Sequence, residues 1–225
     1  PAMDKAVRAL GGIDTKTIIA QAVQMGDECH NRNKATTALL LRDLLPLFFQ
    51  VDEPLEVALR ALSFVRDNEH YFLNLSMPSC KCALDAASGI PNSTVVTVMA
   101  RNGVEFGIRV SGAGDEWFTG PAQMVEGLLF PGFSEDDEAP DLGDSAITET
   151  CGIGGFAMAA SPAIVQFVGG SVSDAFNYSA QMREICEGES KSYLLPPLNF
   201  RGSATGIDVR KVLATNILPV INTGI

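Results

Sequence analysis

The spacing of apolar residues changes once along the chain, shortly after Gly89, and this change determines the expected fold class. Before it, apolar residues in "IIAQAV" and "ALLLRDLLPLFF" recur at intervals of three and four, which is typical of amphipathic helices. After it, two β-rich runs flank Asn102-Gly103, a dipeptide typical of type I′ hairpin turns, in which both central residues need positive φ. The sequence therefore predicts an α+β fold, with a helical subdomain over residues 1–90 and a mixed α/β sheet subdomain over residues 91–225.

Local signals place several element boundaries. Asp14 is expected to cap a helix, Pro54 to lie in the first turn of a later helix, and Pro78 to bend or break a helix. Beyond the hairpin, "AIVQFVGG" is a candidate strand, and the segment 171–190 is a predicted helix capped by Ser171 or Ser173. The last segment, "GIDVRKVLATNILPVINTG", predicts a short helix followed by a strand.

Composition excludes some classes of function. The formal charge of -11 and the lack of clustered basic residues argue against nucleic acid as a general partner. No run of eighteen apolar residues exists, so no membrane span is expected. Five scattered cysteines favour a reducing cytoplasm over a secreted disulfide framework.

Cys80 and Cys82 are the one pair of cysteines close in sequence. The single residue between them is shorter than the spacing of the common zinc sites. We therefore expect buried or half-buried free thiols here, with no metal and no cofactor.

Two polar clusters lie in apolar surroundings, and each contains one of the two histidines. "GDECHNRN" includes His30, Asn31 and Arg32, and "NEHYFLNLS" includes His70 and Asn74. Buried polar groups need hydrogen-bond partners, so each cluster is either a structural network or half of a ligand site.

The predicted hairpin supplies a third group of candidates. Glu105, Gly107 and Arg109 alternate along a strand and therefore share one face, and Arg101 lies just before the turn. The planar guanidinium of arginine suits carboxylate and phosphate, and Gly107 would leave room above the strand. The alternative is a solvated strand face with a surface ion pair.

The glycines of "TETCGIGGF" are the fourth candidate group. Gly152, Gly154 and Gly155 offer backbone amides without side chains, as anion-binding nests do, and a helix N-terminus could follow them. Their spacing matches neither standard nucleotide-binding fingerprint. Close packing of backbone against backbone is the alternative.

Taken together, "GGIDTKTIIAQAVQMGDECHNRN", "NEHYFLNLSM", "ARNGVEFGIRVSG" and the long block from "FPGFSEDDEAPDLGD" to "FVGG" resemble the bacterial YlbE/YahG family, also called AllG. The resemblance extends over essentially the whole chain. Members of that family are usually longer and have a Rossmann-like N-terminal segment that is absent here. The chain is therefore expected to be a fragment of a longer protein.

The resemblance also implies a function. AllG-type members are associated with oxamate carbamoyltransferase, which interconverts oxalurate and phosphate with oxamate and carbamoyl phosphate in allantoin (purine) catabolism. Such members tend to be encoded beside FdrA-like proteins. The expected partners are therefore the small anionic substrates carbamoyl phosphate, oxamate or oxalurate, an FdrA-like subunit, and further copies of the chain in a homo-oligomer. The alternative is a noncatalytic scaffold or a small-acid-binding subunit, and the S-T-R-T-type phosphate motif of ordinary carbamoyltransferases is missing.

Roles can be assigned from the chemistry of carbamoyl transfer, which needs donors for phosphate and for the developing oxyanion, and a clamp for the oxamate carboxylate. We expect Arg101 or Arg109 to hold the carboxylate, and the glycine amides to hold phosphate. The catalytic candidates are His30 or His70, which would polarise the carbonyl or move a proton, oriented by Glu149 or Glu105. The candidate binding residues are Asn31, Arg32, Asn74, Arg101, Asn102, Glu105, Arg109, Gly152, Gly154 and Gly155.

Overall fold

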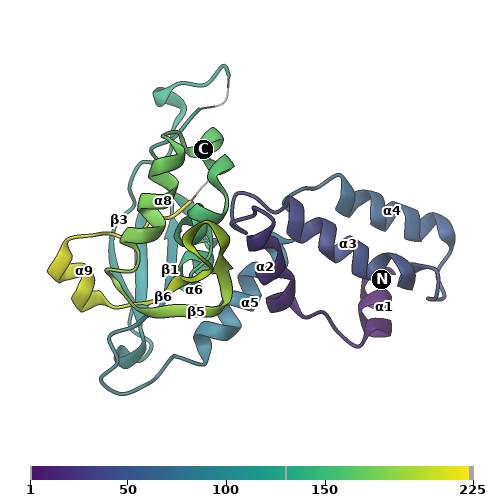
Figure 1. Cartoon of the computed structure of the whole chain (residues 1–225), viewed down its shortest axis with the longest axis horizontal. Helices are drawn as coiled ribbons and strands as arrows, with labels where there is room; N and C mark the ends of the chain where they lie inside the picture. Colours follow the sequence, from purple (N-terminus) through teal and green to yellow (C-terminus); the bar gives the residue numbers. More distant parts are fainter. Residues whose placement is uncertain (1, 130, 223–225) are drawn as a thin grey trace.

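The helices of the N-terminal part lie to one side of the sheets (Figure 1). The structure is a computed structural model that describes residues 2–129 and 131–222. α2 and α5 lie between the other N-terminal helices and the sheets, and they contact β5 and β1 respectively. The predicted α+β class, with helices first and sheets after them, is confirmed. The N-terminal helices are α1 (Ala2–Leu10), α2 (Thr15–Gln24), α3 (Lys34–Phe48), α4 (Leu55–Arg66) and α5 (Leu73–Asp85).

The described strands form two antiparallel sheets. The first has the order β3-β2-β1-β4 and the second pairs β5 with β6. The strands are β1 (Val96–Asn102), β2 (Glu105–Val110), β3 (Phe118–Pro121), β4 (Leu142–Gly143), β5 (Cys186–Leu195) and β6 (Arg201–Ile207). The helical elements of this part are α6 (Ile147–Cys151), the 3-10 helix η3 (Gly154–Ala160), α7 (Val165–Val168), α8 (Val172–Gln181) and α9 (Val209–Thr215).

The predicted hairpin is confirmed, but its turn is not the type I′ turn expected around Asn102-Gly103. Arg101 pairs with Phe106, which leaves a four-residue loop. Gly103 has φ 82, whereas Asn102 is not among the described residues with positive φ. The Asn102 Oδ1 atom instead accepts hydrogen bonds from the amides of Val104 (2.9 Å) and Glu105 (2.6 Å). The asparagine therefore stabilises the turn through its side chain.

The predicted caps are confirmed where the signal is local. The Asp14 carboxylate accepts from the Thr17 amide at 3.0 Å, and Ser171 and Asp174 form a reciprocal capping box at the start of α8. Pro54 directly precedes α4. The helix predicted over residues 171–190 ends at Gln181, because β5 begins at Cys186.

Two other local predictions are wrong. "AIVQFVGG" forms a 3-10 turn and α7 where a strand was expected, because a short apolar run does not distinguish a strand from a buried helix. Residues 217–222 follow α9 but form no strand, and residues 223–225 lie outside the described residues. For Pro78 a bend or a break was expected; α5 continues through it without a break, and the bend stays a prediction.

The main core joins the helical part to the sheet part. It combines Ile19, Leu40 and Phe72 from the first 90 residues with Ile153 and Leu195 from later segments. A second core cluster, with Met99 and Phe156 among its members, lies against the first sheet. Residues of both predicted subdomains thus share one core, and the boundary at residue 90 stays a prediction.

The loop between α2 and α3 is held by a buried carboxylate. α3 receives no side-chain cap from Asn33. Asp27 replaces that cap, because its Oδ2 atom accepts from the amides of Ala35 (2.6 Å) and Thr36 (3.0 Å). Burial raises the pKa of Asp27, and these hydrogen bonds partly oppose that rise. The loop is therefore fixed to the N-terminus of α3.

Replacing Asp27 with Ala should lower the free energy of unfolding by roughly 1–2 kcal/mol, because two helix amides lose their acceptor. Urea denaturation measures this change. Asp67→Ala is the matched control, because Asp67 is exposed and pairs with its neighbour Arg66, so its loss should leave the free energy of unfolding nearly unchanged. Equal unfolding midpoints for the two variants would contradict the capping role.

Candidate functional site

Five polar side chains from distant parts of the sequence form a buried polar cluster. Its members are Glu28, His30, Arg101, Glu149 and Asn222, and each is at most 5% exposed. They come from the α2–α3 loop, β1, α6 and the segment after α9. Buried groups of this kind must be paired, so their contacts determine what the cluster can do.

The central contact is the ion pair between His30 and Glu149. His30 Nδ1 lies 2.7 Å from Glu149 Oε1. The same carboxylate accepts hydrogen bonds from the amides of Gly155 (2.9 Å) and Asn222 (3.1 Å), and from the Thr148 hydroxyl (2.9 Å). Glu149 therefore connects four separate segments of chain and fixes the orientation of the imidazole ring.

The charges around His30 favour its protonated form. Burial alone lowers the pKa of His30, but the charge and hydrogen bond of Glu149, aided by Glu28, outweigh burial and the opposing charge of Arg101. The pKa of His30 is consequently raised above its ordinary value. The ring therefore holds its proton up to a higher pH than an ordinary histidine does, at a position that Glu149 fixes.

Glu28 is the second fully buried carboxylate of the cluster. It accepts from the amides of His30 (3.1 Å) and Arg32 (2.6 Å) and from the Asn222 side chain (2.9 Å). Burial raises the pKa of Glu28, while the charge of His30 opposes the rise. Between Glu28 and His30, Cys29 has φ 66, an unusual value for a buried residue other than glycine.

Arg101 connects the cluster to β4. Its guanidinium binds both oxygens of Asp141, at 2.5 and 3.0 Å, and donates to the Gly143 carbonyl at 3.1 Å. The positive charge of Arg101 opposes the rise in the pKa of His30, so it acts on the imidazole ring. The predicted carboxylate clamp thus already holds a carboxylate of the chain itself.

Arg109 lies on the opposite face of that sheet. Arg101 pairs with Phe106 and Arg109 pairs with Val98, and these two pairs are on alternate sides of the strands. Arg109 binds the fully exposed carboxylate of Asp115 and the Gly114 carbonyl. The register therefore separates the two arginines that the sequence suggested as equivalent.

A small pocket lies against the hairpin. It has a volume of about 220 Å³, and its lining includes the predicted residues Asn102, Glu105 and Gly107. The space expected above Gly107 is occupied, because a Cβ atom there would lie 3.0 Å from the Trp117 ring. Its lining residues are Ala100, Arg101, Asn102, Glu105, Gly107, Trp117 and Thr119.

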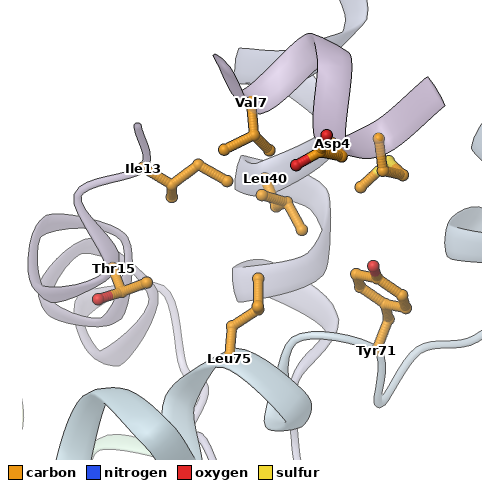
Figure 2. Close-up of a pocket in the computed structure, with 8 residues that line it drawn as sticks. Asp4, Val7, Ile13, Thr15, Leu40, Tyr71 and Leu75 are labelled. Atoms are coloured by element: carbon orange, nitrogen blue, oxygen red, sulfur yellow. The ribbon is translucent and has the colours of Figure 1, made fainter. Parts of the chain in front are cut away.

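A second pocket, of about 310 Å³, lies among the N-terminal helices (Figure 2). Apolar side chains such as Val7, Leu40 and Leu75 surround it, with Asp4 and Tyr71 at its margin. None of the predicted binding or catalytic residues lines it. It therefore contributes nothing to the chemistry considered above.

The glycine amides bind acceptors within the chain. Gly152 donates to the Glu149 carbonyl at 2.9 Å, Gly154 to the Glu28 carbonyl at 2.7 Å, and Gly155 to the Glu149 carboxylate at 2.9 Å. Each amide has a single hydrogen, so none is left for phosphate in this arrangement. A Cβ atom at Gly154 would collide with Glu149 Oε1, so close packing is the role these glycines have here.

Two features are absent from the described residues. No group of three or more His, Cys, Asp or Glu side chains there is arranged to hold a metal ion. No helix within residues 2–129 and 131–222 combines the length and apolarity needed to cross a membrane.

Residues 1–145 match the model of the protein family described as oxamate carbamoyltransferase subunit AllG. The chain belongs to the AllG family. It is 51% identical over 225 residues to the uncharacterized protein YahG of Escherichia coli K12, covering 100% of this chain and 48% of YahG. It is 46% identical over 215 residues to oxamate carbamoyltransferase subunit AllG of the same organism, covering 95% of this chain and 51% of that protein.

A solved structure supports the fold of this AllG-family chain. The crystal structure of a conserved protein of unknown function from Enterococcus faecalis V583 is similar with a TM-score of 0.92 and 53% identity. The match covers 94% of this chain and 51% of that one. The chain thus spans about half the length of the relatives it matches.

The structure unites some of the predicted residues and separates others. His30 and Glu149 meet directly, whereas His70 and Asn74 lie exposed at the start of α5, where the Asn74 side chain donates to the Tyr71 carbonyl. Asn31 and Arg32 lie half-buried beside His30 in the same loop. Glu105 lies at the outer face of the hairpin and does not orient His30.

Sequence reasoning missed Glu28, Asp141 and Asn222. Glu28 stands within "GDECHNRN", so the concentration of polar residues there was a usable signal. Asn222 is 194 residues from its partner Glu28, and nothing local in "INTGI" connects them. Long-range pairing of this kind becomes visible only in the fold.

Gly154→Ala should destabilise the AllG-family chain by roughly 2–4 kcal/mol, because the new Cβ would displace Glu149 and the residue has φ +62. Thermal unfolding of this variant and of a control variant measures the effect. Gly120→Ala is the control, since a Cβ atom there has no neighbour within 4 Å. A Gly154 variant as stable as the control would show that close packing at Glu149 is not required.

The raised pKa of His30 predicts a loss of stability as the pH rises. The folded chain holds this proton more tightly than the unfolded chain, so the contribution is complete below the ordinary value of 6.5 and disappears as the pH passes the higher folded pKa. The raised pKa of Glu28 also lowers stability as the pH rises, and this loss begins near 4.5, the ordinary pKa of a glutamate. His30→Gln should therefore flatten the dependence of unfolding free energy on pH above 6.5, the ordinary pKa of histidine, as measured in urea.

His70→Gln is the matched control for this titration, because His70 is exposed and remote from the cluster. This variant should retain the wild-type slope. A His30 variant with that same slope would rule out linkage between the His30 proton and folding.

Proposed function

We propose that this chain is part of a subunit of an oxamate carbamoyltransferase-type system in allantoin catabolism, which transfers a carbamoyl group between oxalurate or oxamate and phosphate. The observation that carries the proposal is the 46% identity, over 95% of the chain, to a protein named oxamate carbamoyltransferase subunit AllG. The family model gives the same description over residues 1–145.

The reaction needs a proton at the nitrogen of oxamate. When a phosphate oxygen attacks the carbamoyl carbon of oxalurate, the bond from that carbon to the oxamate nitrogen breaks, and the nitrogen must gain a proton. His30 is suited to supply it, because Glu149 binds Nδ1 at 2.7 Å and raises the pKa of the ring. The Nε2 side of the ring then faces the reactant, and Glu149 acts as a positioning residue.

The carboxylate of oxamate would be held by Arg101 if the reaction takes place at His30. Arg101 is buried and its charge acts on His30, whereas Arg109 lies on the other face of the sheet from Arg101. One oxamate molecule cannot contact both arginines, because the backbone of the sheet separates them. Arg101 would exchange Asp141 for the substrate carboxylate, and a bidentate pair would be preserved.

Access to the cluster requires a movement. His30 is 3% exposed, and the Asn222 segment binds both Glu28 and Glu149. Residues 217–222 form no helix or strand, so their displacement would break few backbone hydrogen bonds. We include this opening in the proposal.

The proposal also includes an FdrA-like partner and association of copies of the chain. Large apolar side chains are exposed around the hairpin, among them Val104 (74%), Leu142 (69%) and Trp117 (47%). Exposed apolar groups that cluster on one surface are typical of interfaces. Because the chain spans about half of its relatives, reacting groups from the other half or from the partner would complete the site.

The alternative function is that of a noncatalytic scaffold or small-acid-binding subunit. The complete burial of Glu149 and Glu28 favours it, because a satisfied internal network needs no substrate. The cluster would then join the α2–α3 loop to α6 and would perform no chemistry.

His30→Gln should lower the rate of carbamoyl phosphate formation from oxalurate and phosphate by about 100-fold or more, because general acid catalysis contributes roughly that much. The assay uses the full-length protein reconstituted with its FdrA-like partner. His70→Gln is the control and should retain wild-type activity, and urea unfolding checks that both variants are folded.

A folded His30 variant with full activity would exclude the catalytic role and leave the two noncatalytic functions. Calorimetric titration with oxamate then separates those functions. Saturable binding would support the small-acid-binding subunit, and tight partner association without binding would support the scaffold.

A further inference from the structure

Two thiols from separate helices meet where α5 packs against α6. Cys80 belongs to the main core, and Cys151, the last residue of α6, packs against that core. The two side chains lie close enough for a hydrogen bond between their sulfur atoms. Cys80 is buried and Cys151 is half-buried, so the pair is reached from the Cys151 side.

The hydrogen bond makes the two thiols unequal. It lowers the pKa of Cys151, although burial opposes this, and it raises the pKa of Cys80, as burial does. A thiolate is the reactive form of cysteine. Cys151 is therefore suited to act as the nucleophile, and Cys80 remains beside it as a protonated thiol.

The other cysteines are poorly placed to compete. Cys29 is fully buried, and burial together with Asp27 and Glu28 raises its pKa. Burial raises the pKa of Cys186 to about 12. Cys82 is exposed on α5, but it is two residues from Cys80 and therefore lies on a different side of the helix.

We propose that Cys80 and Cys151 form a peroxide-sensitive modification site that closes to a disulfide. The Cys151 thiolate attacks hydrogen peroxide, so an S–O bond forms, the O–O bond breaks, and water leaves after taking up a proton. The Cys80 sulfur then attacks the sulfenic acid, forming the S–S bond and releasing a second water that carries the Cys80 proton. In total, two thiols and one hydrogen peroxide give one disulfide and two waters.

The disulfide would tie α5 to the helix that carries Glu149. Glu149 and Cys151 are both within α6, so the bond acts on the element that positions His30. This proposal does not depend on the carbamoyl-transfer proposal, because it concerns the thiols alone.

Peptide mapping of the full chain tests the proposal. The folded protein is treated with hydrogen peroxide, its remaining thiols are blocked, and it is digested with trypsin without reduction. Cleavage after Lys and Arg places each of the five cysteines in a different peptide, and Lys81 separates Cys80 from Cys82. We expect the peptide 67–81 to be linked to the peptide 110–183, and dithiothreitol to release them.

Three variants test which cysteines form the link. Cys82→Ser should form the same link, since Cys82 takes no part. Cys80→Ser should form none and should leave a sulfenic acid on Cys151 that dimedone traps. Cys29→Ser should again form the link, and thermal unfolding checks that each variant is folded.

Preferential oxidation of Cys82 while Cys80 and Cys151 stay free would overturn the proposal. A disulfide between Cys151 and Cys29 would overturn it as well, since the assigned partner would be wrong.

Discussion

The sheet part of this chain depends on the hydrogen bonds that the buried Glu149 carboxylate accepts. It is fully buried, and it accepts from Thr148 within α6, Gly155 at the start of η3, Asn222 near the end of the described chain, and His30 in the α2–α3 loop. A buried carboxylate with fewer donors would be costly, so the fold must bring these segments together. This requirement explains why glycine occupies position 154, where a side chain would displace the carboxylate.

The balance of charge in the cluster then determines its protonation. Two buried carboxylates, Glu28 and Glu149, flank one imidazole, and Arg101 adds a positive charge that Asp141 largely neutralises. Protonation of His30 reduces the excess negative charge, which is why its pKa is raised despite burial. The same argument accounts for Glu28, whose carboxylate accepts from two backbone amides and an asparagine side chain, all neutral, and whose pKa is raised by burial.

What the sequence predicted correctly is local. The Asn102-Gly103 hairpin, the Asp14 cap and the Ser171 cap each depend on residues within a few positions of one another. The predictions that failed depended on tertiary context: "AIVQFVGG" is apolar in a way that suits either a strand or a helix, and packing selects the helix. Within the site, His30 and Glu149 were named as candidates because of their chemistry. Their pairing with Asn222 and Glu28 depends on contacts that span most of the chain.

The sheet register limits which of the two hairpin arginines a small substrate could contact. By composition alone, Arg101 and Arg109 are equivalent anion binders near one hairpin. Pairing of Arg101 with Phe106 and of Arg109 with Val98 puts the two arginines on opposite faces of the sheet, and Arg101 is the buried one whose charge acts on His30. A substrate of a few atoms can use one face only. If His30 moves the proton, Arg109 takes no part in that step, and the reactants enter where the Asn222 segment now lies. If that segment never leaves, the cluster serves the fold alone, because no reactant can contact a histidine that is 3% exposed.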